Sequence, residues 1–236
     1  MNGVITTENV YEKKDELLKQ INEYKITDAV KSVTNPETRT YGSEDHKYKV
    51  ALFDFGYKRN IRNELVNRGC EVIVVPADTT AEQIKEIAPD GIMFSNGPGD
   101  PSENTEVIKN IREIAQLGIP IFGICLGHQL MALAHGATTQ KLKYGHRGAN
   151  QPVIDKALGK TFVTSQNHGY AVVGESMDPE IGEVSHINAN DGTCEGMRYK
   201  NINAFTVQFH PEAHGGPQDT AYLFDEFIDM IKKEMH

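Results

Sequence analysis

Apolar runs alternate with amphipathic stretches from residue 49 onward. The runs at 50–53, 72–75 and 91–94 contain no polar position, which is typical of strands buried on both faces of a sheet. Apolar side chains recur at helical spacing in the segments between these runs. Because strands separated by helices require crossover connections, the pattern predicts an α/β fold, with a mostly parallel open sheet and flanking helices.

The alternation continues with a predicted helix over 104–117 and a strand over 119–124. The second half of the chain is richer in short strands. They are predicted at residues 161–164, 170–173, 182–187 and 205–209. The polar residues 166–170 are expected to form a loop before a strand, and a final amphipathic helix is predicted over 220–233.

Residues 1–47 differ in character from the rest of the chain. A short helix is predicted over 12–24, and the residues after it, notably 34–37 and 41–45, are polar and rich in turn formers. We therefore expect residues 1–47 to be a linker or the remnant of a preceding N-terminal domain. Residues 48–236 are expected to form one domain.

Composition excludes several functional classes. The chain has 24 Lys and Arg residues against 33 Asp and Glu residues, a formal net charge of −9, so nucleic-acid binding is not expected. No apolar run approaches the ~20 residues of a membrane span, and the N-terminus lacks the apolar stretch of a signal peptide. The three cysteines show no CxxC spacing, which favours a reducing compartment over a disulfide framework or a zinc site. We expect a cytoplasmic protein.

Cys125 occupies a predicted strand-to-helix junction. Gly123 and Gly127 flank it two residues away on either side, which is the nucleophile-elbow arrangement with cysteine in place of serine. A helix N-terminus stabilises a thiolate, and the amide of Leu126 offers a donor to an oxyanion. The alternative is a packing role, which is common for free cysteines. We give that interpretation to Cys70 and Cys194.

His210 is the best candidate for the base that a catalytic cysteine needs. It closes the predicted strand 205–209, and Pro211 after it disfavours helical geometry at His210. Residues two apart in extended chain face the same way, so Glu212 would lie beside the imidazole and stabilise its cation. His214 is four residues from His210, but Pro and Gly nearby disfavour a metal-binding helix, and no metal is expected. A structural or surface role is the interpretation for His46, His135, His146, His186 and His236.

Two polar segments are candidates for contacts with a substrate. Residues 95–101 form a loop of Gly and Pro after a strand, without the lysine of a P-loop or a GxGxxG pattern. Such a backbone can approach a reacting carbonyl closely, although an ordinary strand–helix turn is the alternative. Residues 166–170 offer hydrogen-bonding groups to a zwitterionic substrate.

Three motifs, in this order, resemble the class I (triad) glutamine amidotransferases. They are Asn96-Gly97-Pro98-Gly99-Asp100-Pro101, Gly123-Ile124-Cys125-Leu126-Gly127-His128-Gln129 and His210-Pro211-Glu212. Within that class, residues 53–60, 75–81, 165–171 and the stretch from 215 into the last helix are similar to the small subunit of carbamoyl-phosphate synthetase. The resemblance extends from residue 49 to the C-terminus.

The resemblance implies an assignment for each motif. Cys125 would attack the side-chain amide of L-glutamine, His210 would shuttle the proton, and Glu212 would orient the imidazole. Backbone amides of Gly97 and Leu126 would form the oxyanion hole. The glutamine pocket would be lined by Gly99, Gln129, Asn167, Gly169 and Tyr170. Ammonia would pass to the large synthetase subunit, which would make carbamoyl phosphate for pyrimidine or arginine biosynthesis; ATP and Mg²⁺ would bind only that partner, and this chain would hold no cofactor.

Two departures from the family leave alternatives open. The family's small subunit has a further N-terminal domain that contributes a serine to the glutamine site, and the first seven residues here resemble only its closing segment. Tyr170 stands where phenylalanine is common. The chain is therefore expected to be an active glutaminase or, alternatively, a weakly active docking fragment. A glutaminase serving anthranilate or GMP synthesis is a further alternative, and a peptidase with the same Cys–His pair is a remote one.

Overall fold

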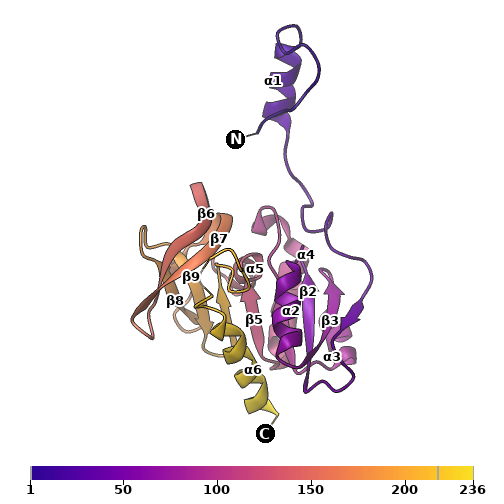
Figure 1. Ribbon diagram of the computed structural model, residues 1–236, viewed down its shortest axis with the longest axis vertical. Helices are drawn as coiled ribbons and strands as arrows, with labels where there is room; N and C mark the ends of the chain where they lie inside the picture. The colour runs from indigo at the N-terminus through magenta and orange to yellow at the C-terminus, as the bar shows by residue number, and fades with distance from the viewer. Residues whose placement is uncertain (1, 217, 236) are drawn as a thin grey trace.

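The computed structural model describes residues 2–216 and 218–235, so the predicted role of His236 lies outside the described residues. The chain forms a ten-stranded sheet in the order β1-β3-β2-β4-β5-β10-β9-β8-β6-β7. Its first half contains β1 (Arg39–Tyr41), β3 (Cys70–Pro76), β2 (Tyr48–Asp54), β4 (Gly91–Phe94), β5 (Ile121–Ile124) and β10 (Ala204–Val207). Helices lie on both faces of these strands (Figure 1).

The five strands from β3 to β10 are parallel, which confirms the predicted α/β architecture. Their residues are buried almost throughout, in keeping with the unbroken apolar runs of the sequence. Strand β1 pairs antiparallel with β3 and so extends the sheet into the segment 1–47. Because parallel strands end at the same edge, the loops after β4, β5 and β10 meet there.

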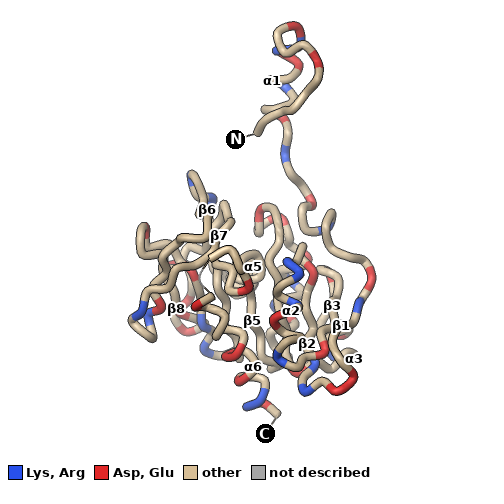
Figure 2. Tube along the Cα trace, in the orientation of Figure 1, with Lys and Arg blue, Asp and Glu red and all other residues tan. Residues whose placement is uncertain are grey.

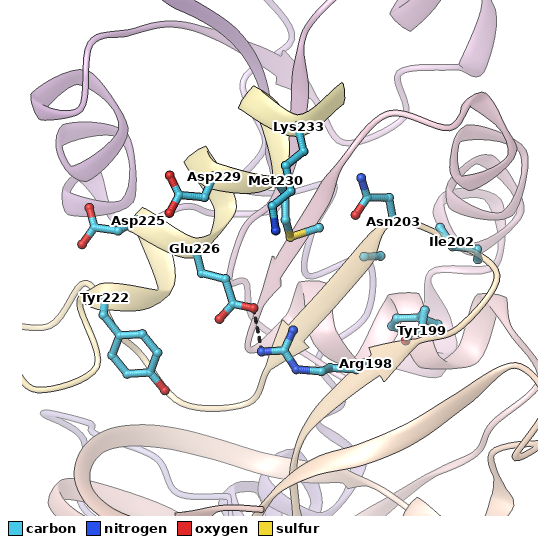
Figure 3. A pocket seen from close by; sticks show the side chains of 11 residues that line it. Arg198, Tyr199, Ile202, Asn203, Tyr222, Asp225, Glu226, Asp229, Met230 and Lys233 are labelled. Atoms are coloured by element: carbon cyan, nitrogen blue, oxygen red, sulfur yellow. Dashed lines mark ion pairs between the residues drawn. The ribbon is translucent and has the colours of Figure 1, made fainter. Parts of the chain in front are cut away.

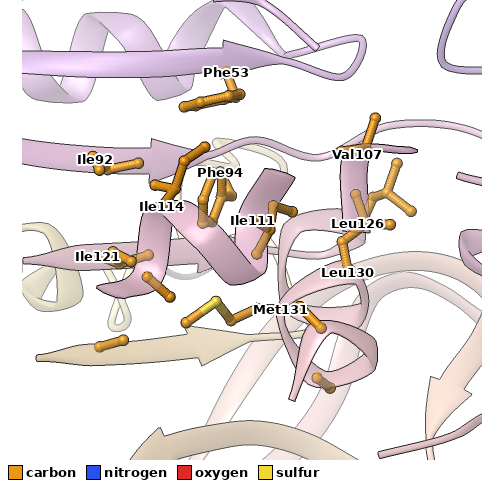
Figure 4. Packing of buried hydrophobic residues seen from close by; sticks show 14 of the residues in the cluster. Phe53, Ile92, Phe94, Val107, Ile111, Ile114, Ile121, Leu126, Leu130 and Met131 are labelled. Atoms are coloured by element: carbon orange, nitrogen blue, oxygen red, sulfur yellow. The ribbon is translucent and has the colours of Figure 1, made fainter. Parts of the chain in front are cut away.

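Two apolar clusters hold the helices against this sheet. One face is covered by α2 (Arg59–Asn67) and α6 (Tyr222–Glu234), whose Ile61, Leu65 and Phe227 are fully buried. The other face is covered by α3 (Ala81–Ile87), α4 (Thr105–Ile114) and α5 (Leu126–Ala134). Figure 4 shows Ile111 and Leu130 of these helices packed among the side chains of the sheet. Short 3₁₀ turns are η1 (Pro101–Glu103), η2 (Ala115–Leu117) and η3 (Gly174–Ser176).

The antiparallel half of the sheet corrects several sequence predictions. It contains β6 (Thr139–Asp155), β7 (Lys160–Val172), β8 (Gly182–Asn188) and β9 (Cys194–Tyr199). The two short strands predicted at 161–164 and 170–173 are one strand, β7, and the predicted loop 166–170 lies within it. The reason is the pairing with β6, which supplies hydrogen bonds to this polar segment across the hairpin. Neither β6 nor β9 was predicted, since both carry polar residues and glycine instead of an apolar run.

The helix predicted over 12–24 is present as α1 (Lys14–Glu23), which stands apart from the sheet (Figure 1). Its Leu17 is buried, whereas Leu18 is 45% exposed. Lys and Arg are scattered among Asp and Glu along the chain (Figure 2). None of the described helices is long and apolar enough to cross a membrane.

Candidate active site

Cys125 lies at the carboxyl end of β5, and β5 itself lies between β4 and β10 in the sheet. Cys125 is also the N-cap residue of α5. Its backbone has φ 54° and ψ −101°, a combination that non-glycine residues rarely adopt. A Cβ atom on Gly127 would lie 2.4 Å from the carbonyl oxygen of Phe94, and one on Gly123 would lie 2.8 Å from Cγ2 of Thr206. The strained turn therefore requires both glycines, as a nucleophile elbow does.

His210 and Glu212 come together directly after β10. Nδ1 of His210 lies 2.8 Å from Oε1 of Glu212, and both side chains are almost wholly buried. The amide of His210 donates to the carbonyl of Ser165 at 2.9 Å, which ties this segment to β7. With Nδ1 engaged by the carboxylate, Nε2 is the ring nitrogen available to the sulfur of Cys125.

The protonation of this pair follows from its surroundings. Burial alone would lower the pKa of His210, but the hydrogen bonds and charges of Cys125 and Glu212 raise it to about 9. Burial alone would raise the pKa of Glu212, but His210 and Lys58 hold it below its ordinary value. At pH 7 the imidazole of His210 is thus a cation beside the carboxylate of Glu212, ready to deliver a proton.

Two residues that sequence reasoning did not single out support Glu212. Nζ of Lys58 lies 3.7 Å from its Oε1, and Nδ2 of Asn60 donates to its carbonyl oxygen. Asn60 also contacts His214, which engages Gln218 through Nδ1. Both Lys58 and Asn60 lie in the 53–60 stretch that carried part of the family resemblance, and that resemblance is the signal that could have found them.

The Gly–Pro loop packs against the first strand–helix turn of the domain. Lys58 donates its backbone amide to Oδ1 of Asn96 at 2.9 Å, and Oγ of Ser95 accepts from the amide of Phe55 at 3.0 Å. A Cβ on Gly97 would lie 2.2 Å from the carbonyl oxygen of Phe55. Only glycine therefore allows the loop to come this close, and it places the backbone of Gly97 beside the first turn of α5.

A cavity of about 560 Å³ opens at Cys125 and His210. Its other lining residues are Val33, Gly56, Tyr57, Lys58, Asn96, Gly97, Pro98 and Asn167. It thus brings two of the predicted substrate residues, Gly97 and Asn167, to the nucleophile. A nucleophile, a protonated imidazole, backbone amides and a cavity in one place suit acyl transfer to sulfur.

The remaining predicted substrate residues are not among those that line this cavity. Nε2 of Gln129 donates to the carbonyl of Tyr170 and to Oε1 of Gln208, both at 2.8 Å, so its side chain braces β7. Tyr170 lines another hollow, together with Asp100 and Lys141. Gly99 has φ +94° and packs toward Ala29. Leu126 contributes the first amide of α5, and Gly169 lies beside Arg147.

The other two cysteines pack in the core. Cys70 and Cys194 are buried, and burial raises the pKa of each thiol to about 12. Their setting fits the packing role predicted for both.

One cluster has the composition of a metal site. Donor atoms of His146, His168 and Glu195 lie within 4.8 Å of one another. His146 is already hydrogen-bonded to Glu195, which, against the effect of burial and together with Asp191, raises its pKa to about 9. A metal ion would have to displace that proton, so the arrangement favours a charged hydrogen-bonded link over a metal centre.

A separate hollow lies between α6 and the β9–β10 turn, away from the triad. It has a volume of about 540 Å³ and is lined by acidic residues of α6 such as Asp225 and Asp229. Figure 3 shows Glu226 of the same helix paired with Arg198, at 2.6 Å. None of Cys125, His210 and Glu212 lines this hollow.

Comparison with known proteins agrees with this geometry. The profile of the glutamine amidotransferase class-I family matches residues 51–230, which include Cys125, His210 and Glu212. The chain belongs to this family.

Relatives in the family give a narrower comparison. The carbamoyl phosphate synthase small chain of Bacillus cereus is 51% identical over 92% of this chain and 58% of its own length. That of Staphylococcus epidermidis is 52% identical over 93% of this chain and 60% of its own length. The chain thus spans about three fifths of these relatives.

A crystal structure from Thermoplasma acidophilum, named as that of a GMP synthase subunit, superposes with a TM-score of 0.71. The match covers 80% of this chain and 96% of the other, at 22% identity. It shows that the amidotransferase fold is shared.

Proposed function

We propose that this chain hydrolyses L-glutamine to L-glutamate and ammonia through a glutamyl thioester on Cys125. The observation that carries the proposal is the position of Cys125, on a strained elbow at a cavity, beside the buried His210–Glu212 pair. The membership in the amidotransferase family supports the same chemistry.

In the first half-reaction, the sulfur of Cys125 forms a bond to the side-chain carbonyl carbon of glutamine. The carbonyl oxygen becomes an anion, which the backbone amides of Gly97 and Leu126 would stabilise. His210 then gives its proton to the amide nitrogen, the carbon–nitrogen bond breaks, and ammonia leaves. Glu212 stabilises the imidazolium before this transfer and keeps Nδ1 occupied.

In the second half-reaction, water replaces ammonia as the partner of His210. The imidazole takes a proton from the water, the oxygen bonds to the thioester carbon, and the carbon–sulfur bond breaks. Glutamate leaves with the added oxygen, and the Cys125–His210 pair regains its starting charge. No cofactor is needed for either half-reaction.

We further propose that the ammonia passes to the large subunit of a carbamoyl-phosphate synthetase, for pyrimidine or arginine biosynthesis. The names of relatives with 51% and 52% identity support this partner. ATP and Mg²⁺ would bind only to that large subunit. A weakly active docking role stays a second candidate, which a glutaminase assay of the chain distinguishes from catalysis. The cytoplasmic location stays a prediction.

The experiment is a glutaminase assay with and without a large carbamoyl-phosphate synthetase subunit. Without the partner, glutamate and ammonia should form in equal amounts. The added partner with ATP and bicarbonate should raise the rate of glutamate formation, and Cys125→Ala should abolish it. Rapid hydrolysis by the chain alone would exclude the docking role. Stimulation only by a GMP or anthranilate synthetase would contradict the proposed partner.

A further inference from the structure

A charged link crosses the antiparallel half of the sheet beside the active site. His146 of β6 has Nδ1 3.1 Å from Oε1 of Glu195 and Nε2 2.9 Å from Oδ2 of Asp191. Glu195 lies on β9 with its side chain wholly buried, whereas Asp191 is about half exposed. We refer to these three residues as the charged link.

The buried carboxylate of Glu195 depends on His146 for compensation of its charge. Among the described residues its Oε1 accepts one further bond, from Nδ2 of Asn188 at 3.2 Å, and its Oε2 has no hydrogen-bond partner. Removing one partner from a buried ion pair leaves a charge without compensation, which is costly. The pKa of His146 is raised to about 9, mainly by the hydrogen bond to Glu195, so the imidazole is a cation at pH 7.

The backbone of His146 lies in a part of the sheet where the register between strands is weakly specified. Strand β6 pairs with β7 at only three consecutive positions there, 146–148, between two register shifts. A short ladder between bulges fixes its register less strongly than a long regular one. The side chain of His146 supplies an additional anchor, because it ties this short segment to β9.

Residues 146–148 pair with residues 166–168 of β7, the strand that carries Asn167. His146 pairs with His168, and Arg147 pairs with Asn167, which lines the cavity beside Cys125. A Cβ on Gly145 would lie 2.3 Å from the carbonyl oxygen of His168, so the two backbones are in close contact. A shift of residues 146–148 would therefore move Asn167.

We propose that His146 is a positioning residue for glutamine binding. Held between Glu195 and Asp191, it fixes residues 146–148 against β7 and so places Asn167 at the cavity. This inference rests on the proposed glutamine hydrolysis. It assigns to His146 a specific role in place of the general structural or surface role expected from the sequence.

The test compares two probes of Cys125 in wild type and His146→Gln. The glutamine analogue 6-diazo-5-oxo-L-norleucine needs the pocket, whereas iodoacetamide needs only the thiol. The analogue concentration for half-maximal labelling rate should rise about tenfold in His146→Gln, because displaced binding groups weaken recognition, while the iodoacetamide rate stays within about twofold. His135→Gln is the matched control, since His135 is a largely buried histidine that bonds to Met131 at the end of α5.

A double-mutant cycle separates the charged link from a general loss of stability. Glu195→Gln combined with His146→Gln should raise the half-maximal concentration less than the product of the single effects, because the double variant leaves no buried charge without a partner. If His146→Gln does not fold, Asp191→Asn at the exposed end of the link should still raise that concentration about twofold.

Three outcomes overturn the inference. The first is an unchanged half-maximal analogue concentration in the folded variants. The second is an equal loss of Cys125 labelling with both probes. The third is a double variant whose half-maximal concentration rises by the product of the two single effects. Failure of the proposed function looks different: wild type would then react with iodoacetamide but remain unlabelled by the analogue.

Discussion

Nδ1 of His210 lies 2.8 Å from Oε1 of Glu212, in a pair of side chains almost wholly removed from solvent. The chain makes this contact with residues only two apart, because Pro211 favours an extended backbone between them. The contact fixes which ring nitrogen faces Cys125 and, after Cys125 itself, contributes to the raised pKa of the imidazole. The chemistry proposed for the site depends on this geometry.

Glu212→Gln tests the orienting carboxylate. The amide keeps the size of the side chain but removes the charge that stabilises the imidazolium, so kcat for glutamine hydrolysis should fall by roughly 10²-fold. Steady-state kinetics measure the effect. Glu183→Gln, an exposed carboxylate on β8, serves as the control and should leave kcat unchanged. A Glu212→Gln enzyme with wild-type kcat would remove Glu212 from the mechanism.

Gly97→Ala tests the close approach of the Gly–Pro loop, residues 95–101, to its neighbours. The added Cβ would lie 2.2 Å from the carbonyl oxygen of Phe55 and 2.6 Å from Cδ2 of Leu126, so the loop must move away from the first turn of α5. We expect kcat to fall by about 100-fold or more, as for loss of an oxyanion donor. Gly215→Ala is the matched control, because a Cβ there meets nothing within 4 Å. Equal activity of both variants would contradict the assigned oxyanion hole.

The pH dependence of stability tests the charged state of His210. Its pKa in the folded chain, about 9, is above the ordinary value of ~6.5, so protonation stabilises the fold fully below pH ~6.5. This contribution is lost as the pH rises through about 9. Thermal denaturation from about pH 6 to pH 10 should show a steeper decline of Tm for wild type than for His210→Asn. The comparison is needed because His146 also has a pKa of about 9. Parallel curves would show that His210 does not carry the raised pKa.

Selective alkylation tests the roles of the three cysteines. Burial raises the pKa of Cys70 and Cys194 to about 12, so neither forms much thiolate at pH 8. Brief treatment of the folded chain with iodoacetamide should therefore modify Cys125 alone, as peptide mass spectrometry would show. Cys125→Ser should remain unmodified under the same conditions. Comparable modification of Cys70 or Cys194 would show that the packing interpretation is wrong.

The parallel half of the fold was predictable because its signals are local. Strands β2, β3, β4 and β5 each contain an unbroken apolar run, and the helices between them carry apolar residues at helical spacing. The elbow at Cys125 was predictable for the same reason, since Gly123 and Gly127 are two residues away on either side. The contacts that exclude a Cβ there come from Phe94 and Thr206 of the neighbouring strands, which the local pattern does not indicate.

The antiparallel half was predicted poorly because its order depends on distant partners. Residues 166–170 are polar and look like a loop, yet they form a strand once β6 pairs with them. The charged link joins His146 to Glu195, 49 residues away, and no spacing rule indicates such a contact. Lys58 approaches Glu212 across an even longer separation. For these residues only the three-dimensional arrangement identifies the role.

The most direct test is mass spectrometry of the chain after acid quenching during reaction with L-glutamine. The account predicts one glutamyl group bound as a thioester to Cys125, lost on treatment with hydroxylamine and not formed in Cys125→Ser. Turnover of glutamine without any adduct on Cys125, or an adduct that persists in Cys125→Ser, would contradict it.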